Sequence, residues 1–406
     1  MPDSPLFSIL HDSLQLQIYD RFNSVPHQQW NAVAKGHGIF LTPRYLESCE
    51  SARLPGMEFR YVIAYEGSKP SAVLYLQISN LSDAGLGGVL NLHDYGFLAG
   101  ALMSKVNSFL FEPSIGSTHL MCCGNLLVSG DQGIAVSDPG VMPRIVAALP
   151  ALFEELTRRL DTGKKVVAWM VKDFTGERDV QVQNGLEKSC FRLHADPVMA
   201  MHLRPEWRSF EDYLNALSSK YRVRAKSALS KLDGIVIKAL EINDIHAHEP
   251  EIGMLLEQVI SKAPVKLVRP VTRYFVQLKQ HFGKHYYFRG YFAGDRMVAF
   301  TSGLWDKQHY EAHYIGMDYE LNRKHSLYQN ILYGFIDDAI QNAPGALLSF
   351  GRTALEIKST VGARPVEMGC YLKLTNALIH KLARPMMGKA GPGDWIPRDP
   401  FRSEGL

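Results

Sequence analysis

Side chains capable of acid–base chemistry gather in one short segment of the C-terminal half, residues 309 to 317, which reads HYEAHYIGM. The segment is predicted to be a strand, whose alternation places Glu311 and His313 on one face and Tyr314 on the other. Glu311 or His313 is therefore a candidate general base, while Tyr314 or Tyr328 is a candidate proton donor to a leaving group. The alternative for each of them is an ordinary hydrogen-bonded residue of a sheet.

Cationic side chains follow this segment at the start of a predicted helix. Apolar residues recur at helical spacing from Leu327 to Ile340, and the approach to this helix reads Asn322-Arg323-Lys324-His325-Ser326. Ser326 is the expected N-cap, and Arg323 and Lys324 precede it where helix amides lack partners, an arrangement that suits a phosphate. The alternative is a capped helix with exposed basic residues.

A second basic segment follows a strand predicted over residues 346 to 350. It contains Arg352 and Lys358, which are expected near the end of a strand adjacent to the helix, where ligands collect in mixed α/β sheets. We expect both side chains at a solvent-accessible cleft. This order of elements suits transfer of an acyl group from a donor with a phosphate-bearing handle, by direct attack of an amine and without a covalent enzyme intermediate.

A weaker copy of this layout lies upstream. A helix is predicted to start near Pro143, and a buried strand follows over residues 165 to 170. The loop before that helix, between Gly124 and Val141, contains two carboxylates and no cation, so a phosphate would be repelled there despite the helix dipole. We therefore predict a duplicated fold whose second half holds the donor and whose first half is degenerate at that position.

Between the two halves, residues 209 to 232 predict one amphipathic helix with an apolar stripe framed by cations. One interpretation is a solvated helix whose long side chains extend around a packed stripe, and the other is contact with phosphate or RNA. Five cations fall within twelve residues without an intervening acid, namely Lys220, Arg222, Arg224, Lys226 and Lys231.

The remaining pattern consists of short strands and periodic helices. Two helices precede a hairpin with strands near 60–65 and 71–79, and a three-stranded meander covers 285–292, 297–305 and 309–317. These alternating elements predict an α/β protein with mixed sheets flanked by helices.

The length of 406 residues, 46% of them hydrophobic, is enough for two cores of ordinary size. We predict two tandem domains at residues 1–205 and 206–382, the second of which begins with the bridge helix. A Pro- and Gly-rich tail follows at 383–406, and we expect no functional site in it.

The composition argues against several classes of protein. The net charge of +3 is too small for a protein that binds nucleic acid over its whole surface. Five cysteines without CxxC spacing predict a reducing, cytoplasmic location. The sequence has no run of about 18 apolar residues, so it does not predict a membrane-spanning helix. The sequence contains neither His/Cys spacing typical of a metal site nor the GxSxG elbow of a hydrolase.

Several of these segments together resemble a known family. The bridge motif Tyr213-Leu-Asn-Ala-Leu-Ser-Ser-Lys-Tyr-Arg222, the pair Asp94-Tyr95, Ser326-Leu-Tyr-Gln, and Gly351-Arg352-Thr with Lys358 are similar to the BioF2-like, FemAB-related branch of the GNAT acyltransferase superfamily. The resemblance covers roughly residues 20 to 380. It implies two tandem GNAT-like domains, each with a mixed central sheet flanked by helices.

The resemblance also implies transfer of an acyl group to the amine of a small molecule or peptide, without a tightly bound cofactor or metal. The donor in the family is acyl-CoA or, in the Fem relatives, aminoacyl-tRNA. Neither half has the family's Arg/Gln-x-x-Gly-x-Gly/Ala pyrophosphate loop, whose place residues 322 to 326 take without a glycine. The donor therefore stays open between acyl-CoA, an acyl carrier and tRNA. Asp94, Tyr95 and Arg222 are expected to bind the substrate.

A third interpretation is a duplicated scaffold that binds a peptide, glycan or cell-wall precursor without catalysis. It predicts a closed or filled donor groove beside Arg323 and Arg352. The sequence sets neither the acyl group nor the acceptor amine nor the oligomeric state.

Overall fold

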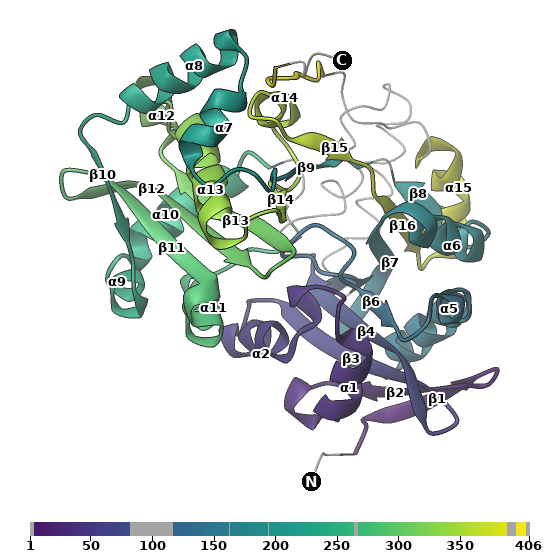
Figure 1. Cartoon of the computed structure of the whole chain (residues 1–406). Helices are drawn as coiled ribbons and strands as arrows, with labels where there is room; N and C mark the ends of the chain where they lie inside the picture. Colours follow the sequence, from purple (N-terminus) through teal and green to yellow (C-terminus); the bar gives the residue numbers. More distant parts are fainter. Residues whose placement is uncertain are drawn as a thin grey trace. The chain divides into compact units, whose positions relative to one another are not determined.

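Two mixed β-sheets, one in each of two units of the chain, organise the fold (Figure 1). The computed structural model describes residues 4–81, 117–161, 163–193, 195–263, 267–387 and 395–402. Unit 1 contains Met1–Asp196, Pro264–Pro270 and Glu367–Pro392, and unit 2 contains Pro197–Ala263, Val271–Val366 and Gly393–Leu406. The predicted α/β class, with mixed sheets flanked by helices, is confirmed.

The sheet of unit 1 has, among the described residues, nine strands: β1 (Phe7–His11), β2 (Leu14–Tyr19), β3 (Met57–Glu66), β4 (Lys69–Asn80), β5 (Ser117–Cys123), β6 (Ile134–Val136), β7 (Lys164–Phe174), β8 (Phe191–Leu193) and β16 (Gly369–Leu374). Their order is β1-β2-β3-β4-β5-β7-β16-β8, and β6 pairs with β4. The predicted hairpin is β3 and β4, whereas the hairpin of β1 and β2 lies outside the predicted elements.

Helices of unit 1 cover this sheet because strand alternation makes both faces apolar. Val62 and Leu74 lie in the cluster that buries the predicted stripe of α5 (Met142–Arg159). Tyr61 points to the other face, where its ring packs 6.0 Å from that of Trp30 in α1 (His27–Ala34). The remaining helices of unit 1 are α2 (Pro43–Ala52), α6 (Gly176–Leu186) and α15 (Ala377–Met387), with short 3-10 turns at Phe22–Ser24, Ile39–Leu41 and Pro139–Val141.

The sheet of unit 2 has, in the described ranges, seven strands: β9 (Val198–His202), β10 (Ile235–Ala239), β11 (Tyr286–Ala293), β12 (Arg296–Trp305), β13 (His309–Met317), β14 (Leu347–Ser349) and β15 (Arg364–Val366). Their order is β10-β11-β12-β13-β14-β9-β15. Strands β11 to β13 are the predicted meander, and β14 pairs with β13 in parallel.

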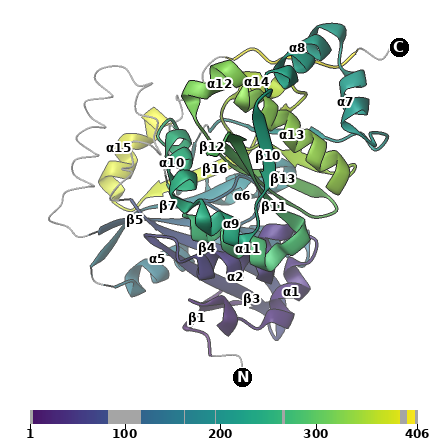
Figure 2. The same cartoon turned by 90° about the vertical axis from the view of Figure 1, so that its left-hand side faces the viewer.

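Helices pack on both faces of this sheet as well. Figure 2 shows α10 (Glu249–Ile260) and α11 (Thr272–Phe282) on one face and α13 (Leu327–Asn342) on the other. The remaining helices of unit 2 are α7 (Phe210–Ala216), α8 (Ser219–Ser230), α9 (Ile242–Ala247), α12 (Tyr319–His325) and α14 (Leu355–Ser359), with a 3-10 turn at Gly283–His285. Every helix in the part of the chain that the structure describes is too short or too polar to cross a lipid bilayer.

The residue ranges of the two units differ from the predicted domains 1–205 and 206–382. Strand β9 precedes residue 205, yet it belongs to unit 2 because it pairs with β14 and β15. Strand β16 lies within the second predicted range, yet it belongs to unit 1 because it pairs antiparallel with β7. Hydrogen bonding between distant strands, rather than chain order, therefore decides the membership of these segments.

The prediction of one bridge helix over residues 209 to 232 is wrong, because the segment forms two helices. Ser209 caps α7 through a capping box with Asp212, and the helix ends at Leu217, whose backbone is extended. Leu217 remains buried, and its backbone forms an isolated bridge to Phe401. The apolar stripe is thus kept across a break that periodicity alone does not reveal.

One carboxylate of the acidic loop of unit 1 is paired with a cation from a later helix. Arg178 of α6 donates to both carboxylate oxygens of Asp131 at 2.5 and 3.1 Å, and Asp138 accepts a hydrogen bond from the backbone of Gly140 at 2.8 Å. The prediction of two carboxylates without a cation is therefore wrong for Asp131, whereas the printed partner of Asp138 is a neutral backbone amide. A cation 47 residues away in the sequence supplies the missing charge.

A buried ion pair ties the end of β7 to the loop that follows β5. Lys172 Nζ donates to Asp173 and to the backbone carbonyls of Asn125 and Val128 at 2.7 and 3.1 Å. Asp173 has a left-handed backbone with φ of 72°, and its carboxylate also accepts from Gly130 N and Cys370 Sγ, at 3.0 and 3.1 Å. Because the pair is sealed from water, its two charges depend on each other.

Replacing Lys172 by alanine should destabilise unit 1 by about 3–5 kcal/mol, because the buried Asp173 carboxylate would lose its counter-charge. Urea unfolding followed by circular dichroism measures this loss. Lys188→Ala provides the matched control, since Lys188 is exposed and its removal should change the free energy of unfolding by less than about 0.5 kcal/mol. Equal effects of the two substitutions would contradict the role of the ion pair.

Candidate functional site

The parallel strands β13 and β14 of unit 2 form three residue pairs, which is the whole length of β14. His309, Tyr310 and Glu311 pair with residues 347 to 349, and β13 then continues to Met317 without β14. Helix α12 and then α13 follow β13 in the chain, and α14 follows β14. In open α/β sheets, ligands collect at this carboxyl end of parallel strands.

The corresponding parallel pair of unit 1 is longer. β5 and β7 are also parallel, but they pair from Ser117 opposite Lys164 to Cys123 opposite Val171, which is the whole length of β5. The two sheets thus share a parallel pair at equivalent places in their topology and differ in how far that pair extends.

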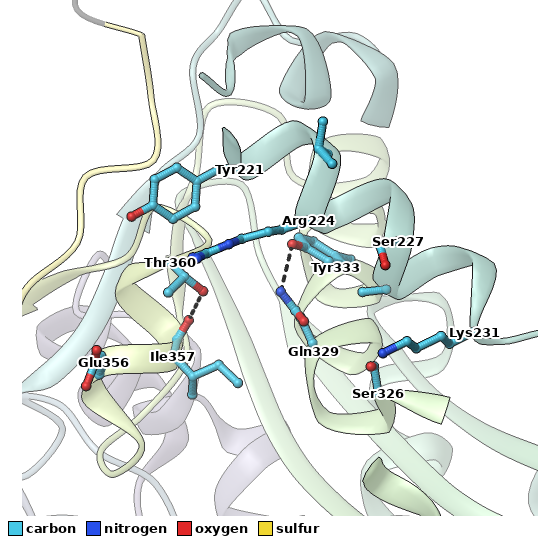
Figure 3. A pocket seen from close by; sticks show the side chains of 12 residues that line it. Tyr221, Arg224, Ser227, Lys231, Ser326, Gln329, Tyr333, Glu356, Ile357 and Thr360 are labelled. Carbon is cyan, nitrogen blue, oxygen red and sulfur yellow. Dashed lines mark hydrogen bonds between the residues drawn. The ribbon is translucent and has the colours of Figure 1, made fainter. Parts of the chain in front are cut away.

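A pocket with a volume of about 630 Å³ lies in unit 2 between α8, the first turns of α13, and α14 (Figure 3). Two cations of α8, Arg224 and Lys231, line it, and Glu356 of α14 faces them. Arg224 extends across the pocket toward α14, and Lys231 points toward Ser326 (Figure 3). The other lining residues are Tyr221, Val223, Ser227, Ala228, Gln329, Tyr333, Ile357 and Thr360.

The start of α13 differs in part from the predicted cap. Ser326 is the N-cap residue, as predicted, but it has a left-handed backbone with φ of 48°, and its side chain makes no capping hydrogen bond. Asn322 of the preceding helix takes over, because its Oδ1 accepts from Tyr328 N at 2.9 Å. The Ser326 side chain lines the pocket instead.

The predicted cations Arg323 and Lys324 lie on α12 rather than in a loop. Both are exposed, and the described residues that line the pocket do not include them. The neighbouring His325 is buried, and its Nδ1 lies 2.9 Å from the backbone carbonyl of Lys231. This contact attaches the end of α12 to the end of α8, which fixes one wall of the pocket.

Lys358 is not at a solvent-accessible cleft, in contrast to the prediction. Its side chain is buried, at 4% exposure, and its ammonium donates to the backbone carbonyls of Gly351 and Arg352 at 3.1 and 2.6 Å. Thr353 and Ala354 take left-handed backbone, which turns α14 so that Lys358 points back to the loop. Arg352 is half-buried in the same loop and does not line the pocket.

Glu311 is the last residue of β13 that pairs with β14, and it is 2% exposed. Its Oε2 lies 3.0 Å from Nε2 of His309, which is partly exposed. Sequence reasoning missed His309, although its spacing of two residues from Glu311 in a strand places both on one face. The pair joins a buried carboxylate to solvent through an imidazole.

His313 occupies a β-bulge. Ser302 of β12 pairs with Tyr314, and the next residue, Gly303, pairs with Ala312, so His313 is the extra residue. The bulge interrupts alternation, and the prediction that Tyr314 lies on the opposite face from His313 is wrong. Both rings pack against Tyr274 of α11, with centroid distances of 5.4 and 6.3 Å.

The His313 ring is enclosed between hydroxyl groups. Its Nε2 lies 3.0 Å from the Tyr274 hydroxyl, and its Nδ1 lies 3.2 Å from Ser302 Oγ. Burial lowers the pKa of His313 to about 3. A ring with so low an affinity for protons is poorly suited as a general base near neutral pH, so the geometry favours Glu311 over His313 in that role.

The other predicted residues lie outside the pocket lining. Burial raises the pKa of Tyr328, so its hydroxyl keeps its proton at neutral pH. Arg222 is half-buried on α8, with Nη1 3.4 Å from Asn215 Oδ1. Asp94 and Tyr95 lie outside the described residues. Within the described ranges, no group of three or more His, Cys, Asp or Glu side chains is arranged to hold a metal ion.

The spacing of the two cations that line the pocket, Arg224 and Lys231, is visible in the sequence, but the prediction used it only to place them on the helix. Arg224, Ser227 and Lys231 are spaced by three and four residues, so they share one face of α8. Prediction placed Arg224 and Lys231 beside the apolar stripe but did not assign them to the site. What they face could not be read from the sequence, because α13 and α14 are about 100 residues downstream.

Comparison with known proteins is informative at the level of structure alone. No protein-family model matches the sequence, and no curated protein matches it. A tandem GNAT protein from the clavulanic acid biosynthesis pathway superposes with a TM-score of 0.50 at 10% identity, covering 89% of this chain and 98% of that one. FemX gives a TM-score of 0.49 at 11% identity, with the same coverage of 89% and 98%. The chain thus has the fold of a tandem GNAT protein.

Replacing His313 by glutamine should flatten the pH dependence of stability below about pH 6.5. The folded state keeps this ring neutral down to a pKa of about 3, whereas the unfolded chain protonates it below about pH 6.5. The unfolded state therefore binds the additional proton in this window. The free energy of unfolding falls as the pH falls, with a slope from this group that approaches about 1.4 kcal/mol per pH unit.

Urea titrations at several values between pH 7 and pH 4.5 measure this slope for wild type and His313→Gln. The comparison of slopes is insensitive to any constant loss of stability in the variant. His246→Gln serves as the control, because His246 is exposed on α9 and its replacement should leave the slope unchanged. A slope identical in wild type and His313→Gln would contradict the buried neutral ring.

Proposed function

We propose that this protein is an N-acyltransferase whose donor, acyl-CoA or a related acyl carrier, binds in the pocket of unit 2. The observation that carries this proposal is the pocket of unit 2 lined by Arg224, Lys231 and the first turns of α13, in a unit whose parallel strand pair is shorter than that of unit 1. The tandem GNAT fold agrees with acyl transfer in general. The acceptor is an amine of a small molecule or peptide.

Phosphate groups of the donor are assigned to the pocket. Arg224 and Lys231 supply two cations, and Ser326 places the N-terminus of α13 beside them. Charge-assisted hydrogen bonds from such groups are roughly twice as strong as neutral ones, and backbone amides at a helix start favour anions. Arg323, Lys324 and Arg352, on the segments that precede α13 and α14, are proposed as outer contacts of the same donor.

The acyl group is assigned to the stretch of β13 beyond Glu311. In the described sheet this stretch pairs with β12 on one side and has no strand on the other. Strand edges of this kind present backbone groups that can hydrogen-bond an extended ligand and a developing oxyanion. The amine then attacks the acyl carbon directly, the new C–N bond forms as the bond to the carrier breaks, and no covalent enzyme intermediate is needed.

Glu311 is the proposed general base, with His309 as its link to solvent. The carboxylate would accept the proton that the attacking amine releases, and the imidazole 3.0 Å away could pass it on. Tyr328 and Tyr314 are the proposed acids toward the leaving group; burial raises the pKa of Tyr328, which makes its hydroxyl a weaker proton donor in the free protein. Asp94, Tyr95 and Arg222 remain proposed substrate contacts.

Unit 1 is proposed to lack a donor site. Its parallel pair is longer than that of unit 2, and Lys172 of β7 binds Asp173 and a backbone carbonyl of the loop that follows β5. The ion pair between Asp131 and Arg178 adds a further internal contact in the same loop. We infer one donor site per chain.

A second candidate is a Fem-type transferase that draws its acyl group from aminoacyl-tRNA. The observation that favours it is the exposed cationic surface of α8 outside the pocket, where Lys220 and Lys226 are both exposed and neither lines the pocket. A tRNA backbone would track such a surface through salt-sensitive phosphate contacts. A CoA-sized donor would not need the exposed cations Lys220 and Lys226 of α8.

Replacing Lys231 by alanine should weaken CoA binding about tenfold, as expected for the loss of one charge-assisted contact of about 1.5 kcal/mol. Isothermal titration calorimetry at two salt concentrations measures this change. Lys226→Ala is the matched control, because Lys226 lies on the same helix, is exposed, and is not part of the pocket. If CoA does not bind while both substitutions weaken tRNA binding equally, the Fem-type alternative replaces the proposal.

Replacing Glu311 by glutamine should lower kcat about 100-fold with little change in KM, because the amine would lose its proton acceptor while donor contacts persist. Release of the CoA thiol from acetyl-CoA in the presence of a panel of amines provides the measurement. Ile315→Val is the control for disturbance of β13, because Ile315 lies on the same strand and has no proposed role in the reaction, and a smaller effect is expected from it. Undiminished turnover in Glu311→Gln would assign the base elsewhere.

A further inference from the structure

The C-terminal segment 395–402 is attached to unit 2 at a defined place. Phe401 packs its ring 5.8 Å from that of Trp207 and 6.2 Å from that of Tyr213. It also fills the space above Gly362, where an added Cβ would approach the Phe401 ring to 2.5 Å. The ring is thus an anchor in the core of unit 2, although prediction assigned the tail no site.

Backbone hydrogen bonds fasten the same segment to the break between α7 and α8. Ser218 N donates to Pro400 O at 2.9 Å, and Arg402 N donates to Ala216 O at 3.1 Å. The isolated bridge between Leu217 and Phe401 lies between these two bonds. The segment therefore holds the start of α8, which is one wall of the pocket.

The other end of the contact lies on α14, the opposite wall. Arg398 N donates to Ser359 Oγ at 3.0 Å, and the Arg398 guanidinium donates through both Nε, at 3.1 Å, and Nη2 to Oε1 of Glu356. Glu356 is the single carboxylate among the described residues that line the pocket. One segment thus joins both walls and pairs with the negative charge between them.

An unpaired carboxylate in this position would oppose the binding of an anion. Arg224 and Lys231 attract a phosphate, whereas Glu356 repels it across the same space, which is open to solvent and only partly screened. The hydrogen bond to Glu356 raises the pKa of Arg398, so this cation is permanent at any physiological pH.

We propose that segment 395–402 is a strap that completes the anion-binding pocket, with Arg398 as the residue that neutralises Glu356 and thereby sets the affinity for a phosphate or pyrophosphate group. This rests on the proposed function only in assigning that group to an acyl donor. Phe401 is the anchor of the strap, and Arg398 acts on the bound anion through Glu356 rather than by touching it.

A double-mutant cycle tests the proposal. Affinities for inorganic pyrophosphate and for CoA are measured by calorimetry at low salt with wild type, Arg398→Ala, Glu356→Gln and the double variant. Arg398→Ala should weaken pyrophosphate binding about fivefold, the limit for a compensating exposed pair, and raised salt should shrink the difference. Glu356→Gln should bind as wild type does, and Arg398→Ala in the Glu356→Gln background should have no further effect.

Arg402→Ala is the matched control within the strap, because the described contact of Arg402 is made by its backbone. It should leave both affinities unchanged, and thermal unfolding of every variant confirms that the chain still folds. Phe401→Ala should reproduce the effect of Arg398→Ala by releasing the strap, again only when Glu356 is present.

Three outcomes would overturn the inference. An equal loss from Arg398→Ala with and without Glu356 would mean direct contact with the anion instead of neutralisation. An equal loss from Arg402→Ala would mean a general effect of charge, and no binding of pyrophosphate by wild type would remove the anion pocket itself. If pyrophosphate binds with the expected cycle while CoA does not bind, the strap is supported and the acyl-CoA donor of the proposed function is what fails.

Discussion

The shortness of β14 is the constraint on which the rest of unit 2 depends. Parallel pairing stops after Glu311 because β14 ends at Ser349, and β13 continues to Met317 with no described strand on that side. A continuous ladder would satisfy the edge of β13 with another strand and leave no place for a ligand. The bulge at His313 contributes to the same geometry, because it bends β13 and increases its twist just beyond the last pair.

Duplication of one topology with two endings explains the asymmetry of the chain. Unit 1 repeats the parallel pair but extends it along β5 and closes the region after it with Lys172, Asp173 and the carbonyls of a loop. Such a buried pair contributes little net stability compared with apolar packing, yet it fixes one arrangement of the loop, because any other arrangement would leave a charge without a partner. In unit 1 the loop after β5 is thus held in place by Lys172, whereas in unit 2 the stretch of β13 beyond Glu311 has a described strand on one side alone.

Local pattern predicted most of the fold and fewer of the contacts at the site. The apolar stripes of α5 and α13 and the meander β11 to β13 follow from periodicity, since each depends on neighbours within a few residues. The break at Leu217 escaped prediction because Leu217 is buried, and the apolar stripe therefore continues across the break. Lys358 was placed at a cleft because its two carbonyl partners are visible only once Thr353 and Ala354 reverse the chain. The bulge misled the face assigned to Tyr314 for the same reason: alternation is a local rule, and a single added residue in one strand cancels it.

The loop between β14 and α14 stores conformational strain. Thr353 and Ala354 hold φ values of 66° and 48°, a region that costs a non-glycine residue roughly 1 kcal/mol or more. The Lys358 ammonium counteracts this cost by clasping the carbonyls of Gly351 and Arg352. Lys358, which was predicted to bind a ligand, therefore stabilises this loop from inside. When its two hydrogen bonds break, the loop is expected to change conformation before the rest of the unit. Amide hydrogen exchange in this unit would then be fastest in the loop rather than in the sheet, because local unfolding starts in the least stable segment of the backbone.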